Sequence, residues 1–141
     1  MKLCFYTLLA YDYKLSYASI LSYYNIADEI ILAVDSARLS WSGKPFEFDE
    51  KAVNNFILRI DKNKKIKLVQ QPFYNPALDV TDNETNERNQ ISKLFPADST
   101  IIAINSDEVL LNPDEFWMWL SSYDDNKDIE AIEYRDPVLK E

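Results

Sequence analysis

The chain alternates between short apolar runs and segments whose apolar residues recur at helical spacing. The runs predict buried strands over residues 2–10, 28–35, 66–71 and 100–104, with a further strand at 129–134. Alternation of strands with helices is typical of an α/β domain with three layers, in which a mainly parallel central sheet lies between helices. At 141 residues the chain is long enough for one such domain, residues 1–141.

Helical spacing and helix-start signals fill the intervals between these strands. The first helix is expected over residues 15–24, and Asp49 is expected to cap the second. The third would start at Thr81 or Asp82 in a capping box and end near Leu94. Asn112 and Pro113 would open the fourth, with Phe116, Trp117 and Leu120 on its apolar side. Residues 37–48, which hold the only glycine, are predicted to form a loop.

Two of the predicted strands end in acidic residues. The run before residue 105 stops at Asn105-Ser106-Asp107-Glu108, and the second strand stops at Asp35. In open α/β sheets ligands bind outside the carboxyl ends of the strands. Carboxylates at that edge suit a hard divalent cation bound to phosphates. The pattern therefore predicts a ligand site there.

Composition narrows the chemistry of this site. A net charge of −9 argues against binding to a nucleic-acid backbone or to anionic lipid. The chain has no histidine, which excludes histidine-based catalysis and leaves oxygen ligands for any metal. Cys4 is the only cysteine and is expected to be a small buried hydrophobe in a reducing, cytoplasmic compartment. The first strand is followed by no glycine-rich loop, which argues against a dinucleotide fold or a P-loop.

No apolar stretch approaches the ~20 residues that span a bilayer. The apolar N-terminus is interpreted as the first strand, because the polar residues after it leave no small-residue cleavage site of a signal peptide.

Each candidate residue also has a purely structural interpretation. Asp35 could cap the turn that follows its strand. Arg88 lies four residues after Glu84, so the two could form an ordinary surface ion pair on a helix. Asp107 could cap a short turn at the end of its strand.

Taken in order, these segments resemble the N-terminal, nucleotide-binding part of family 2 glycosyltransferases, which have the GT-A fold. The resemblance rests on the opening strand, the strand that ends at Asp35, the helical segment Asn86-Glu87-Arg88-Asn89, and the strand that ends in Asn105-Ser106-Asp107-Glu108. The last segment is similar to the family's Asp-x-Asp motif, with Asn105 in place of the first aspartate.

The resemblance implies a Rossmann-like domain that binds a nucleotide-diphosphate sugar. Asp35 would bind the base, Arg88 would support the nucleotide, and Asn105 would hydrogen-bond the ribose. Asp107 would ligate Mg²⁺ or Mn²⁺ bridging the diphosphate, with Glu108 as a structural partner. The implied reaction is transfer of the sugar to the hydroxyl of an unknown acceptor.

Family members continue well beyond the Asp-x-Asp motif, so the acceptor-binding half is expected to be short or absent here, and no catalytic base is assigned. The alternative function is a non-catalytic, degenerate GT-A domain that acts as a binding module. A nucleotidyltransferase is less favoured, since residues 8–14 lack a glycine-rich basic loop. An exposed sheet edge would favour a homo-oligomer.

Overall fold

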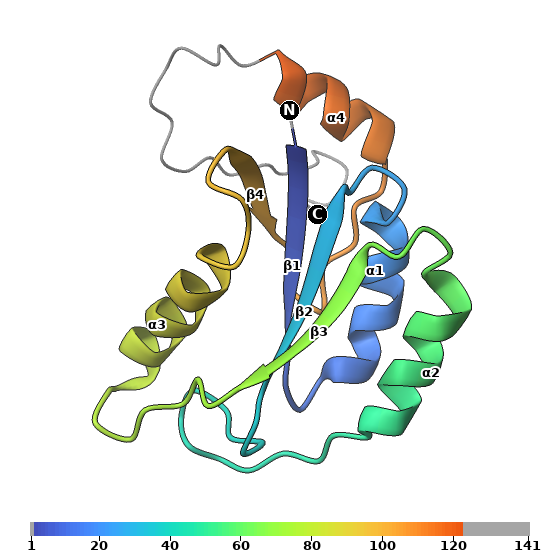
Figure 1. The fold of residues 1–141 in the computed structure, drawn as a ribbon. Coiled ribbons are helices and arrows are strands. Elements are labelled where there is room, and N and C mark those ends of the chain that lie inside the picture. The colour runs from blue at the N-terminus through green and yellow to red at the C-terminus, as the bar shows by residue number, and fades with distance from the viewer. Residues whose placement is uncertain (1, 123–141) are drawn as a thin grey trace, which may run out of the picture.

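The computed structural model describes residues 2–122 and shows an α/β fold with a parallel sheet (Figure 1). The described sheet has four strands in the order β3-β2-β1-β4, and every neighbouring pair is parallel. The strands are β1 (Lys2–Leu9), β2 (Glu29–Asp35), β3 (Ile66–Gln71) and β4 (Ser99–Ala103). Four of the predicted strands are thus confirmed, and the predicted strand at 129–134 lies outside the described residues.

Helices cover both faces of the sheet, which confirms the three-layer prediction. The elements are the short 3-10 helix η1 (Tyr13–Leu15) and the helices α1 (Ser16–Tyr23), α2 (Glu50–Ile60), α3 (Val80–Ser92) and α4 (Pro113–Ser121). Figure 1 shows α1 and α2 on one side of the sheet and α3 on the other. Among residues 2–122, none of the helices combines the length and the apolar character that a bilayer crossing needs.

Alternate residues of the central strands feed two separate cores. Toward α1, α2 and α4 the core includes Phe5, whose ring stacks on Tyr23 with centroids 4.5 Å apart. Toward α3 the core includes Cys4, Tyr6 and Ile91. Cys4 is fully buried, as its place in an apolar run predicted.

Side-chain caps fix where the helices begin. Asp49 accepts a hydrogen bond from the Ala52 amide at 3.0 Å, and Asn112 accepts one from the Glu115 amide at 3.1 Å, so the predicted cap at Asp49 and the predicted start of the fourth helix are confirmed. The prediction for α3 was wrong: Asp79 is its cap and accepts from the Asp82 amide at 2.8 Å. Because the helix starts earlier than expected, Thr81 and Asp82 fall inside its first turn.

Two burial predictions near the end of the described chain were also wrong. β4 borders the described sheet, and its Ile101 and Ile102 are only half-buried. On α4 the buried residues are Phe116 and Leu120, whereas Trp117 is 38% exposed. A residue directly after Phe116 is rotated about 100° around the helix from it, so Trp117 points away from the core.

Candidate functional site

The carboxyl ends of β1 and β4 form the topological switch point of the sheet. From β1 the chain moves outward to β2 and β3 on one side, and it then crosses by α3 to β4 on the other side. A crevice for ligands is expected where the strand order reverses in this way. At this position the hydroxyl of Ser106 donates to an Asp12 carboxylate oxygen at 2.6 Å. Asp12 was not among the predicted site residues, although it is the first acidic residue after β1 and an acidic residue at a strand end was the signal that singled out Asp35.

Arg88 connects α3 to both of these strands. Its guanidinium donates to the Tyr6 hydroxyl of β1 at 3.1 Å and to Asn105 Oδ1, just after β4, at 3.4 Å. It also pairs with Glu84 on its own helix at 3.1 Å. The predicted ion pair between Arg88 and Glu84 therefore exists. The Arg88 guanidinium also contacts Asn105, so two of the predicted site residues lie together.

The segment after β4 is a tight turn held by its own side chains. The Asn105 amide donates to a Glu108 carboxylate oxygen at 2.8 Å, and the Ser19 hydroxyl of α1 donates to the Asn105 carbonyl at 3.2 Å. Glu108 therefore stabilises the turn, which agrees with the structural role expected for it. Asp107 is exposed in the same turn.

The donor atoms available for a metal are few. In the described part of the chain, no three Asp, Glu, Cys or His side chains lie close enough together to form a metal-binding group. Asn105 Oδ1 already accepts a bond from a cationic side chain, Arg88, and that neighbour disfavours a second cation there. Metal binding by Asp107 stays a prediction, and it would involve a single carboxylate, as in sites where Mg²⁺ is held by one or two carboxylates together with substrate phosphates.

Asp35 lies at the end of β2 with its carboxylate turned into the protein. It is 5% exposed and accepts hydrogen bonds from three backbone amides, those of Ala37, Leu39 and Tyr74, at 2.9 to 3.1 Å. The structural interpretation, a cap for the following turn, accounts for two of these bonds. The third bond, from the Tyr74 amide, connects the segment after β3 to the end of β2. Binding of a nucleobase by Asp35 stays a prediction. Both carboxylate oxygens of Asp35 already accept hydrogen bonds from these backbone amides.

The loop that leaves β2 folds over the same edge of the sheet. We call residues 36–48 the strap. Within it, Leu39 and Pro45 form an antiparallel bridge, and Gly43 lies in the intervening turn with a φ of +79°. Trp41 reaches from this turn to α3, where its indole Nε1–H donates to Glu87 at 2.6 Å. Sequence reasoning predicted a loop here and gave no role to Trp41 or Glu87.

Asn83 on α3 fixes the other contacts of the strap. It is 1% exposed, and its amide group donates to the Trp41, Asn75 and Leu78 carbonyls at 3.1 to 3.2 Å. Its Oδ1 accepts from the Asn75 amide at 2.8 Å. A single buried side chain therefore joins the strap, α3 and the segment that precedes α3.

Glu87 is an acidic residue whose side chain is almost fully shielded from solvent. It is 6% exposed, and burial raises the pKa of its carboxyl to about 7. The hydrogen bond from Trp41 acts in the opposite direction, and the nearby Asp35 charge raises the pKa further. Glu87 therefore changes protonation near neutral pH, beside the residues predicted to bind the nucleotide.

We predict that Gly43→Ala destabilises the protein by about 1–2 kcal/mol. A Cβ at this position would lie 2.5 Å from the Tyr74 hydroxyl oxygen, and an L-residue is strained at this positive φ. Urea unfolding measures the change, with Ser42→Ala in the exposed part of the same turn as control. Equal stability of the two variants would show that the turn does not constrain Gly43.

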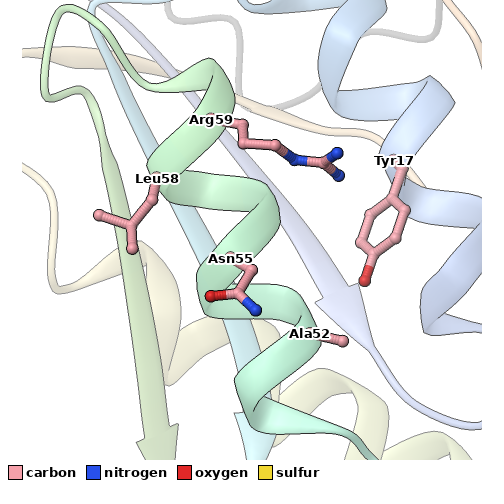
Figure 2. A pocket seen from close by; sticks show the side chains of 5 residues that line it. All are labelled: Tyr17, Ala52, Asn55, Leu58 and Arg59. Carbon is pink, nitrogen blue, oxygen red and sulfur yellow. The ribbon is translucent and has the colours of Figure 1, made fainter.

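A groove also lies on the helical layer, between α1 and α2 (Figure 2). It is lined by Tyr17, Ala52, Asn55, Leu58 and Arg59. Figure 2 shows the Arg59 side chain extending across the groove toward Tyr17. The Tyr17 ring stacks on Phe56 of α2, with centroids 4.1 Å apart. None of the predicted site residues lines this groove.

Comparisons with known proteins give no further assignment. No family model, no curated protein and no solved structure matches the chain at a significant level.

Proposed function

We propose that the chain is a glycosyltransferase-like domain that binds a nucleotide-diphosphate sugar at the carboxyl edge of its sheet. The observation that supports this most is the contact of Arg88 with Asn105, at 3.4 Å. It joins a residue of α3 to a residue two positions after β4, beside the switch point, where open α/β sheets bind their ligands. The sequence resemblance had assigned both residues to the nucleotide.

The proposed roles follow from charge and position. Arg88 is held by Tyr6 and Glu84 and supplies a fixed positive charge beside the crevice. Asp107 is exposed and would hold Mg²⁺ or Mn²⁺ through its carboxylate. The bound metal would neutralise charge on the leaving diphosphate. The acceptor hydroxyl would need a carboxylate base, and no described residue is assigned that role.

We expect calorimetric titration with UDP-, GDP- and dTDP-sugars to detect binding that needs Mn²⁺. Asp107→Ala should weaken that binding at least tenfold, because the metal would lose the one carboxylate that the described residues are proposed to supply. Asp98→Ala is the matched control, since it removes the same charge from an exposed turn before β4, at the other end of that strand. The proposal fails if the wild-type protein binds none of the donors, or if both variants lose affinity equally.

A second candidate is a GT-A-like binding module without transfer activity. It is favoured by the absence of a three-ligand acidic group among residues 2–122 and by the occupied Asn105 side chain. Release of free sugar from a bound donor in the presence of Mn²⁺ separates the two candidates. Measurable hydrolysis supports the enzyme, and binding without hydrolysis supports the module.

A further inference from the structure

The strap, residues 36–48, is attached to the opposite layer of the fold by few contacts. It connects β2 to α2, which lies on one face of the sheet, and it contacts α3, which lies on the other (Figure 1). Its hydrogen bonds to α3 are the 2.6 Å bond from Trp41 to Glu87 and the 3.1 Å bond from Asn83 to the Trp41 carbonyl. Both involve Trp41, so the contact of the strap with α3 depends on this residue, while the Ala37 and Leu39 amides hold the start of the strap to Asp35.

Burial and the charges of Asp35 and Glu84 oppose ionisation of Glu87, whereas the Trp41 indole and the Arg88 guanidinium favour it, and burial has the largest effect. Asp35 faces Glu87 from β2, and on α3 Glu87 lies beside Glu84 and Arg88, which pair with each other. Arg38 of the strap is engaged elsewhere: it donates to the Asp35 carbonyl at 3.1 Å and pairs with Glu50 at 3.5 Å. Residues 72–78, which follow β3, contain no charged side chain.

We propose that the strap is a proton-controlled latch over the carboxyl edge of the sheet. When Glu87 is neutral, Trp41 stays docked on α3 and the strap covers the end of β2. When Glu87 is ionised, the carboxylate gains water if Trp41 leaves, so undocking of the turn around Trp41 becomes easier, while Asp35 keeps its bonds to the Ala37 and Leu39 amides at the start of the strap. The latch acts in the free protein and does not depend on the identity of any ligand.

The size of the effect follows from linkage between protonation and opening. The docked form holds the proton of Glu87 with a pKa of about 7, and an undocked, hydrated Glu87 would return toward 4.5. With those two values, the equilibrium constant for opening rises about tenfold between pH 6 and pH 8. The tryptophan indole reports this opening directly, because its N–H is the donor of the latch.

The test measures hydrogen exchange of the Trp41 indole by NMR at pH 6 and pH 8, with Trp41→Phe used to assign its signal. After correction for intrinsic exchange rates, protection should fall about tenfold from pH 6 to pH 8, and the indole shift should titrate with a midpoint near 7. Glu87→Gln keeps an acceptor for the indole and removes the charge, so its protection should be the same at both pH values.

Three results would overturn the latch. The first is equal protection of the wild-type indole at pH 6 and pH 8. The second is a tenfold fall that persists in Glu87→Gln. The third is protection of the indole equal to that of the Phe5 and Leu32 amides in the core, which would mean that only global unfolding exposes Trp41. The wild-type titration decides the matter even if Glu87→Gln folds poorly.

Discussion

Asp35→Ala is expected to lower the free energy of unfolding by about 3 kcal/mol or more. The substitution leaves the amides of Ala37, Leu39 and Tyr74 without the buried acceptors they have now. Each buried donor that loses its partner costs about 1–3 kcal/mol. Urea unfolding of the wild-type and variant proteins at pH 7 measures the difference.

Asp49→Ala is the matched control for this prediction. Asp49 is also an acidic residue that accepts from a backbone amide, but it is exposed and has one such bond, to Ala52. Loss of a helix cap of this kind costs about 1 kcal/mol. Asp35→Asn should fall between the two, because its amide keeps one acceptor oxygen. If Asp35→Ala cost no more than Asp49→Ala, the triple hydrogen bond would not stabilise the fold, and a role in ligand binding would gain weight.

The stability of the protein should also fall as the pH rises toward and through neutrality, because of Glu87. Its pKa is about 7 in the folded protein and 4.5 without the fold, so the folded state binds the proton more tightly. The stabilisation is therefore complete below pH 4.5 and is lost as the pH rises to about 7. The difference of about 2.5 pKa units corresponds to about 3 kcal/mol in total.

Urea unfolding between pH 5.5 and pH 8.5 avoids the isoelectric region near 4.5 and captures about 2 kcal/mol of this loss. In Glu87→Gln the loss should be absent, so the variant gains stability relative to the wild type as the pH rises. Glu47→Gln, an exposed position of the strap, controls for the change in net charge. Parallel pH dependence of Glu87→Gln and the wild type would show that Glu87 is hydrated in the native state.

A substitution of Asp35 should also change the titration of Glu87. Asp35 and Glu87 are like charges, and Asp35 contributes to the raised pKa of Glu87. Asp35→Asn should therefore shift the Trp41 indole titration to lower pH, because removal of the Asp35 charge makes ionisation of Glu87 easier. An unchanged midpoint would mean that burial alone sets the pKa.

Local patterns in the sequence determined most of the architecture. The run over residues 66–71 predicted β3 with its exact limits, Asp49 was identified as a cap, and Asn112 and Pro113 were identified as the start of the fourth helix. These features depend on a few neighbouring residues, so they can be predicted without knowing what packs against them. The error at α3 arose from competition between nearby capping residues, in which Asp79 prevailed over Thr81 and Asp82.

The candidate site was predictable only in part. The rule that ligands bind at strand ends found Asp35, Asn105 and Asp107 from the sequence, and the same rule applied to β1 would have found Asp12. The partners of these residues are far away in the chain: Ser106 meets Asp12 across 94 positions, and Arg88 meets Tyr6 across 82. Such pairs follow from the order of the strands, which no local pattern contains.

The sequence by itself therefore determined which segments are strands and helices, that the sheet is mainly parallel, and that acidic residues gather at its carboxyl edge. Only the tertiary structure decided that Asp35 is turned inward onto three amides, and that Glu87 is buried beneath Trp41. The physical reason is that hydropathy and capping act between neighbours along the chain, whereas burial and the pKa of a carboxyl depend on which distant segments exclude water from it.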